Sequence, residues 1–311
     1  MQYSQFQDFE ISKVKAKGWL EAFLQTQKSG LTGHLEAAGF PFDMVGWHNF
    51  SDSMAFDVDV ADVWWPYEQT GYWIDGMVKC GILLDDEFLL DKAYKSVDFC
   101  LNNPDADGYL GPIGIKTSDG TGTNRWAHVV FFRALMVLAD TDERIIPALE
   151  RHYLSNTSEH YNFREVLNIE IMLWLYSKTG NKTLLEMAKT AYEKHDREWA
   201  VKNDRDTALA TMLSDRKPTE HGVSYCEFSK LGSIMYIYTG EKIYLDASIN
   251  VVEKLIRDHI LVSGVCSGSE HLRGKTPLFS IVSKKSDLHM AGRISPTHPS
   301  PLPNLVVDSS P

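Results

Sequence analysis

Cysteine is scarce in this sequence, and the spacing of its cysteines excludes two kinds of cysteine-built structure. The 311 residues include four cysteines, at positions 80, 100, 226 and 266. None of them forms a CxxC pair, so the pattern indicates neither a disulfide framework nor a zinc knuckle. Three of them, Cys80, Cys100 and Cys226, fall inside apolar helical stretches. There a cysteine is typically a small buried side chain.

Basic residues are also few. Lysine and arginine number 31 against 42 aspartates and glutamates, which gives a net charge of −11. A protein that binds nucleic acid must neutralise phosphates with lysine and arginine, and no basic cluster offsets the deficit. The composition therefore excludes nucleic acid as a partner, whereas a neutral sugar is indifferent to the overall charge.

Long apolar runs are missing as well. No stretch of roughly eighteen consecutive apolar residues occurs, which a membrane-spanning helix would need. The first ten residues, MQYSQFQDFE, contain no apolar core of a secretory signal. We therefore expect no membrane partner and a cytoplasmic location.

A helical period dominates from residue 11 to about residue 262. Within residues 71–103, apolar residues recur three and four positions apart, break at a polar turn (residues 85–87) and then resume. This pattern is typical of two antiparallel helices joined by a short turn. Strand-like alternation is nearly absent, so we predict an all-α protein.

The helical hairpin repeats along the chain. Similar turns recur around four marker residues, Asp86, Asp142, Asn181 and Glu241. The repeat is ragged and averages roughly fifty residues, the size of two helices with their connections. Solenoid repeats tend to be regular, whereas enzymatic barrels carry uneven loops on one rim. The uneven spacing and the polar insert at residues 105–125 therefore favour an α/α barrel.

The last 31 residues have a different character. Residues 281–311 lose the helical period and contain five of the twelve prolines, which helices do not accommodate in their interior. We predict a partial barrel domain over residues 1–280, incomplete at its C-terminal side, and a disordered tail over residues 281–311.

Polar residues stand at the start of the first helix of each hairpin. They occur as pairs or short groups around Gln69, His128, Glu165 and His221, and a later loop ends in Glu270 and His271. If the hairpins wrap into a barrel, these helix starts converge at one rim. Histidine and carboxylate groups there suit hydrogen bonds to sugar hydroxyls and proton transfer. The same residue types also cap helices, so a purely structural role stays open for each position.

Aromatic residues lie close to these groups in the sequence. The four tryptophans concerned are Trp64, Trp65, Trp73 and Trp126. Their flat faces could stack against sugar rings.

Several sequence blocks occur together in a fixed order. They are the run WWPYEQTGYWIDGMVKCGILLDDEFLLDKAYKSVDFCLNNPDADGYLGP (residues 64–112), AHVVFFRAL (127–135), REVLNIEIMLWLYSKTGN (164–181) and EHGVSYCEFSKLGSIMYIYTGEKIYLDA (220–247). With them, residues 9–280 resemble the N-terminal barrel region of the β-L-arabinofuranosidase family, glycoside hydrolase family 127 and its close relatives. The resemblance implies an (α/α)6 six-hairpin barrel and hydrolysis of arabinofuranosides or related glycosides.

The resemblance also implies roles for individual residues. His128 and His221 fall where two sugar-binding histidines of the family occur, while Arg164, beside Glu165, stands where a third is expected. Glu270 lies in the loop that carries the family's acid/base glutamate. We therefore expect Glu270 to be the general acid, which requires burial or a neighbouring carboxylate to keep it protonated. The expected sugar-binding residues are Gln69, His128, Arg164, Glu165, His221 and His271.

The family's nucleophile is a cysteine held at a zinc site downstream. This sequence leaves the family pattern after residue 280, as a frameshift, a retained intron or a gene-model error would produce, and none of its cysteines matches a ligand position. We expect zinc in the full-length family but no metal site in this chain, which we expect to be inactive as a hydrolase. Two alternatives stay open: an unsaturated uronide hydrolase or sugar epimerase on the same barrel, and a non-enzymatic, degenerate sugar-binding barrel.

Overall fold

The computed structural model describes residues 10–43, 47, 64–116, 125–155, 160–262, 264, 266 and 270–275. Every regular element in these ranges is a helix, and the only β-type contact they contain is a single bridge between His221 and His271. The predicted all-α class is therefore confirmed. The tail at 281–311 lies outside the described residues, so its predicted disorder stays a prediction.

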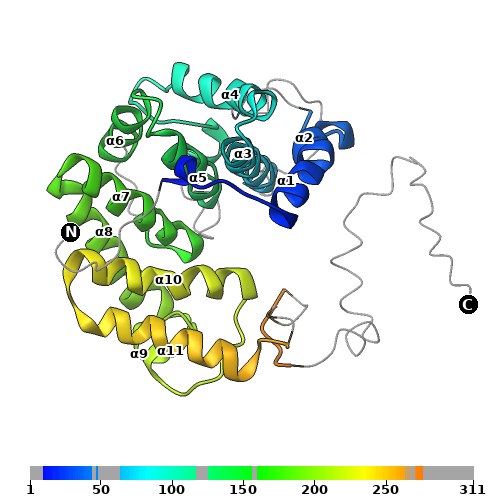
Figure 1. Ribbon diagram of the computed structural model, residues 1–311. Helices are drawn as coiled ribbons and strands as arrows, with labels where there is room; N and C mark the ends of the chain where they lie inside the picture. The colour runs from blue at the N-terminus through cyan, green and yellow to red at the C-terminus, as the bar shows by residue number, and fades with distance from the viewer. Residues whose placement is uncertain are drawn as a thin grey trace, which may run out of the picture.

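Four antiparallel helix pairs form the body of the protein (Figure 1). They are α3 (Trp64–Leu84) with α4 (Glu87–Asn102), α5 (Trp126–Leu138) with α6 (Ile145–Ser155), α7 (Ile169–Thr179) with α8 (Lys182–Lys194), and α10 (Gly222–Thr239) with α11 (Lys242–Asp258). Their turns lie at the four predicted markers.

Shorter elements precede and connect the pairs. At the N-terminal side lie η1 (Ile11–Lys13), α1 (Trp19–Ser29), α2 (Leu31–His34) and η2 (Leu35–Ala38). Between the pairs lie η5 (Ile113–Ile115), η6 (Phe163–Asn168), the π-helical turn η7 (His195–Ala200) and α9 (Leu209–Leu213). The element η6 leads directly into α7, so the third pair begins near Arg164.

The turns of the last two pairs share one local mechanism. Gly180 and Gly240 adopt left-handed φ angles of 73° and 74°, and their N–H groups donate to the carbonyls of Tyr176 and Tyr236 at 2.9 and 2.8 Å. A glycine in this conformation is the common end of an α-helix because it lacks the Cβ that would be strained there. The repeated TGN and TGE triplets thus end α7 and α10 in the same way.

The first helices of the pairs form an inner row. Helix α3 packs against α5, α5 against α7, and α7 against α10, while the second helices cover their outer side. Ten of the thirteen residues of α5 are buried, against four of thirteen in the outer helix α8. A helix enclosed by neighbours is apolar almost all round, whereas a surface helix buries one stripe.

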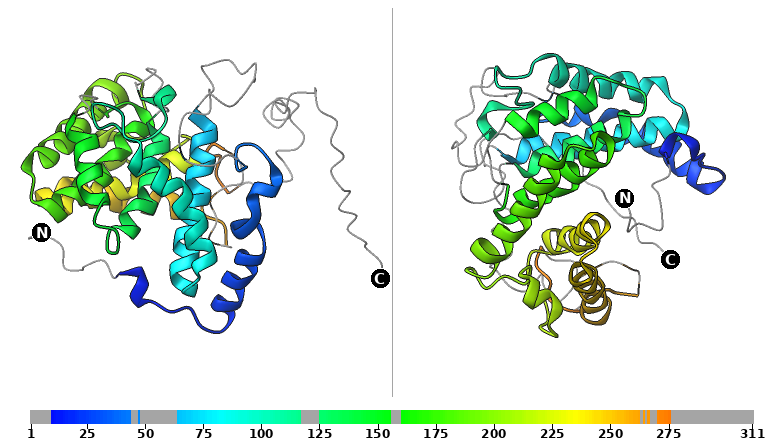
Figure 2. Two further views of the ribbon diagram at one scale, coloured as in Figure 1. Left: turned by 90° about the horizontal axis from the view of Figure 1, so that it is seen from above. Right: turned by 90° about the vertical axis from the view of Figure 1, so that its left-hand side faces the viewer.

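The pairs follow one another in chain order around an arc, from α3–α4 to α10–α11 (Figure 2). The described residues hold four pairs, not the six of an (α/α)6 barrel. Two clusters make up the core. The larger runs from α3 to α10, and the smaller, which includes Tyr225, Val251 and Leu272, lies between α9, α10, α11 and the segment at 270–275.

Two glycines in inner helices allow a matched test of this packing. A Cβ on Gly232 would lie 2.4 Å from the carbonyl oxygen of Tyr244 in α11, whereas a Cβ on Gly76 meets nothing within 4 Å. We expect Gly232→Ala to destabilise the protein by about 1–3 kcal/mol through overpacking. Gly76→Ala is expected to stabilise it by about 0.5–1 kcal/mol through helix propensity. Urea unfolding measures both, and equal midpoints for the two variants would contradict the close α10–α11 contact.

Candidate functional site

Polar side chains from the inner row meet at the N-terminal ends of its helices. We call this group the mouth cluster: Glu68 on α3, Trp126 on α5, Arg164 on η6, and His221 and Ser224 at the start of α10. Arg164 lies at its centre and is 8% exposed. Residues separated by more than 150 positions in the chain thus form one polar site.

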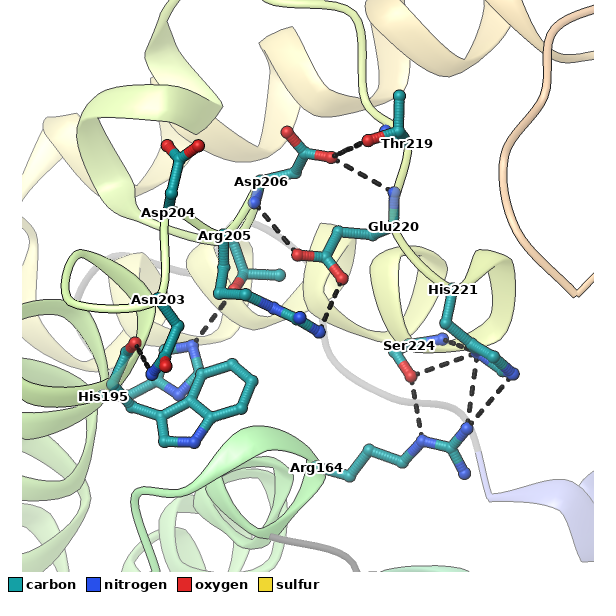
Figure 3. A network of polar contacts seen from close by, with 12 residues as sticks. Arg164, His195, Asn203, Asp204, Arg205, Asp206, Thr219, Glu220, His221 and Ser224 are labelled. Carbon is teal, nitrogen blue, oxygen red and sulfur yellow. Dashed lines mark hydrogen bonds and ion pairs between the residues drawn. The ribbon is translucent and has the colours of Figure 1, made fainter. Parts of the chain in front are cut away.

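The guanidinium of Arg164 bridges two neighbouring helices. Its Nε donates to Ser224 Oγ at 2.8 Å, and its Nη2 lies 3.3 Å from both ring nitrogens of His221. Its Nη1 lies 3.4 Å from Glu68 Oε1 on α3. Figure 3 shows Arg164 reaching toward Ser224 and the His221 ring. The start of α7 is thereby connected to α3 and to α10.

Aromatic rings surround this guanidinium. Its central carbon lies 5.9 Å from the ring centroid of Trp64, 5.6 Å from that of Trp126 and 5.5 Å from that of Phe163. We call these three rings the aromatic wall. Such distances allow cation–π attraction. Phe163 also has a φ of 24°, a backbone conformation that costs energy for an aromatic residue and that clusters at functional sites.

His221 is held in its neutral form. Its Nδ1 accepts the backbone N–H of Ser224 at 3.3 Å, which caps α10. Burial and the charge of Arg164 both lower the pKa of the imidazole, and the carboxylate of Glu270 partly opposes them. Only one nitrogen of a neutral imidazole accepts a hydrogen bond. Because Nδ1 already accepts from Ser224, the approach of Arg164 Nη2 to 3.3 Å is a close contact with the ring.

The pKa of Glu68 is shifted in the opposite direction from that of His221. Its carboxyl is buried, and burial raises its pKa, while the hydrogen bond from Trp126 and the charge of Arg164 act against that rise. Trp126 Nε1 donates to Glu68 Oε1. A raised pKa is the direction of shift that general-acid catalysis requires of a carboxyl group.

A second network of hydrogen bonds and one ion pair holds the segment that leads into α10 (Figure 3). Asp206 accepts the backbone N–H groups of Thr219 and Glu220 at 2.6 and 3.1 Å. Glu220 in turn accepts from the Asp206 backbone and pairs with Arg205 at 2.8 Å. These bonds hold the segment that presents His221.

The segment at 270–275 lies along the same start of α10. The N–H of Gly222 donates to the Glu270 carbonyl at 2.6 Å, and the N–H of Leu272 donates to the Glu220 carbonyl at 2.9 Å. The rings of His221 and His271 lie 5.9 Å apart. The side chains of Glu270 and His271 are both exposed.

A layer of charged residues lies further along the inner helices. Arg133 on α5 pairs with Glu170 on α7 at 2.9 Å and with Glu227 on α10 at 2.6 Å, and Lys230 contacts both carboxylates. Two positive and two negative charges face each other here, so this layer is balanced. Beside it, burial raises the pKa of Tyr72 to about 12.

The structure brings together some of the predicted site residues and separates others. Arg164 and His221 are in direct contact, with Glu270 and His271 on the adjacent segment. Gln69 is exposed outside the mouth cluster. Glu165 is buried on the other side of η6, where its charge counteracts the lowering of the Arg125 pKa by burial.

His128 lies in a separate group, which we call the histidine core: His128, His152 and His160, all 1–3% exposed. The Nε2 of His128 lies 3.1 Å from the carbonyl oxygen of Leu110, and the Leu110 N–H donates to His152 Nδ1 at 2.9 Å. The DGYLGP loop (107–112) precedes α5 in the chain. These two contacts hold it against α5 through His128 and against α6 through His152. His128 thus holds a loop in place and does not contact the mouth cluster.

Glu68 and Ser224 belong to the mouth cluster but were not among the predicted binding residues, whereas Trp126 was predicted as a stacking face. A signal for Glu68 existed, because it lies four residues after Trp64 and four before Tyr72. Residues at this spacing share a helix face, and Gln69 lies about 100° away on the same helix. For Ser224, one helical turn after His221, the sequence offers no comparable signal.

The zinc site implied by the resemblance can be tested against the described cysteines. Burial raises the pKa of Cys100 and of Cys226 to about 12 and also raises that of Cys80. A zinc-bound cysteine must be a thiolate. Among the described residues, no three histidine, cysteine or acidic side chains are grouped so as to hold a metal.

Comparisons with known proteins identify no relative, so a function must be argued from the geometry of the site. A scan of protein-family models, a search of curated proteins and a search of solved structures each found no match to this chain. Of the described helices, none is both long and apolar enough to cross a membrane.

The histidine core predicts how stability depends on pH. Burial lowers the pKa of His128 to about 3, so the folded state keeps it neutral while the unfolded chain takes up a proton near its ordinary pKa of about 6.5. The stability contribution is complete above about pH 6.5 and falls as pH drops toward 3, by about 1.4 kcal/mol per pH unit.

A variant without this titration tests the prediction. His128→Gln keeps a donor for the Leu110 carbonyl but cannot be protonated, so the slope of unfolding free energy between pH 6 and pH 4.5 should become less steep by about that amount. The matched control is His34→Gln at an exposed position, which should leave the slope unchanged. Chemical denaturation over a pH series gives these slopes, and identical slopes for His128→Gln and the unmodified protein would refute the assignment.

Proposed function

We propose that this chain is a carbohydrate-active α/α-barrel protein and that the mouth cluster holds one sugar unit. The observation that carries the proposal is the position of Arg164 between the aromatic wall and the acceptors Ser224, His221 and Glu68. Sugar rings present C–H faces that stack on aromatic rings and hydroxyl groups that pair with planar polar side chains. The mouth cluster combines both kinds of group.

The chemistry proposed for this site is glycoside hydrolysis of the β-L-arabinofuranosidase type on a six-hairpin barrel. The ordered sequence blocks support it, and so does a buried carboxyl with a raised pKa, which a general acid requires. The buried group is Glu68, whereas Glu270 is exposed. We therefore assign the proton donor to Glu68 within this proposal.

We expect this chain to bind a sugar without hydrolysing a glycoside. A retaining mechanism needs a nucleophile on the opposite face of the sugar from the acid. The family's nucleophile is a thiolate, and three of the four described cysteines, Cys80, Cys100 and Cys226, have raised pKa values. We expect sugar binding without release of arabinose from an aryl arabinofuranoside, and clear release would overturn this part of the proposal.

The aromatic wall provides the test of sugar binding. Trp64→Ala removes a stacking face, so we expect at least a tenfold loss of affinity for arabino-oligosaccharides, corresponding to about 1.4 kcal/mol. The matched control is Trp19→Ala on α1, where the ring is 81% exposed and should not affect binding. Titration calorimetry measures both variants. Absence of binding by the unmodified protein, or equal affinity after both substitutions, would contradict the proposal.

A further inference from the structure

The charge of Arg164 is weakly compensated within the mouth cluster. Its nearest acceptor, Ser224 Oγ at 2.8 Å, is uncharged, and His221 is neutral. The remaining acceptor, Glu68, lies 3.4 Å away, longer than the 2.7–2.9 Å typical of charge-assisted hydrogen bonds. The same oxygen of Glu68, Oε1, also accepts the hydrogen bond from Trp126 Nε1.

Two other arginines of the same region show the contrast. Arg133 contacts two carboxylates, at 2.9 and 2.6 Å, and Arg205 pairs with Glu220 at 2.8 Å. The side chain of Arg164 is more buried than either, at 9% exposed against 15% and 33%, but its carboxylate contact among the described residues, with Glu68, is longer, at 3.4 Å. A buried cation without a close counter-ion is costly, which points to an anionic ligand as the missing partner.

The surroundings of Arg164 suit an anion attached to a ring. The guanidinium is a planar fork that matches the two oxygens of a carboxylate. Its Nη1 and Nη2 make only contacts of 3.3 to 3.4 Å with described residues, which a ligand can replace. The N-terminal ends of α7 and α10 add partial positive charge, and the aromatic wall stands beside the guanidinium.

We infer that the mouth cluster takes an acidic sugar, whose carboxylate binds Arg164 and whose ring lies against the aromatic wall. This inference rests on the proposed function, since it specifies the kind of sugar that the same site holds. It also gives Arg164 a role at a position where the sequence resemblance led us to expect a histidine. A hexuronic acid has the required chemistry, because it differs from the neutral hexose by a carboxylate in place of a hydroxymethyl group.

Three probes separate the contributions of charge and ring: D-galacturonate, D-galactose and acetate. We expect the full chain to bind galacturonate at least tenfold more tightly than galactose and to bind acetate more weakly than galacturonate, as measured by ligand-observed NMR titration. Arg164→Gln should bring the ratio of galacturonate to galactose affinity close to one. Arg144→Gln, which removes an exposed arginine paired with Asp98 and Asp142, should leave the ratio unchanged.

A second variant tests the inference even if Arg164→Gln does not fold. Glu68→Gln removes the competing carboxylate, so the ratio of galacturonate to galactose affinity should rise severalfold, an effect that a merely structural role of Arg164 would not produce. Circular dichroism checks that each variant is folded. A ratio that does not rise in folded Glu68→Gln would overturn the inference.

The outcomes distinguish this inference from the proposed function. Equal binding of galactose and galacturonate, or binding of galactose alone, would overturn the acidic-sugar inference and leave the sugar-binding proposal standing. Acetate binding as tight as that of galacturonate would show a site for free anions and overturn the inference. Binding of none of the three probes would overturn the acidic-sugar inference, whereas the sugar-binding proposal is decided by the titration with arabino-oligosaccharides.

Discussion

One guanidinium joins the N-terminal ends of three inner helices. Arg164, at the entry to α7, contacts Ser224 and His221 on α10 and Glu68 on α3. The inner helices bury most of their surface against neighbours, so their sides offer little space for polar groups. Their ends are different, because the first N–H groups of a helix need partners from outside it. The mouth cluster therefore forms where the helix starts meet, while a second, charge-paired layer lies further along the inner helices.

The same packing gives the histidines of the chain two different roles. His221 stands at a helix start and takes part in the mouth cluster, where it caps α10 and contacts Arg164. His128 stands near another helix start but faces the outer helices, where it and His152 clamp Leu110. Burial lowers the pKa of both imidazoles. The two histidines therefore differ in their contacts: those of His128 hold a loop, and those of His221 place it in the candidate ligand site.

The distribution of charge links the site to its proposed ligand. In the layer beyond the mouth cluster, Arg133 and Lys230 are matched by Glu170 and Glu227. In the mouth cluster, the described carboxylate that pairs with Arg164 is Glu68, at 3.4 Å. The two layers therefore differ in how closely their positive charges are paired with carboxylates of the protein. The deeper layer pairs its charges within the protein, and the outer one is where we propose that an anion binds.

The sequence by itself determined the helices and turns, because these depend on contacts between near neighbours in the chain. The apolar period of three to four residues indicated the hairpins, and Gly180 and Gly240 end α7 and α10 through backbone geometry that only their own turns require. The choice of Glu68 over Gln69 was decided by the tertiary structure. Adjacent residues on a helix point about 100° apart, and the rotation of α3 is set by packing against α5, close enough at Gly71 that an added Cβ would lie 3.3 Å from the backbone of Phe131. Which side chains share a site therefore depends on helix rotations that no local pattern specifies.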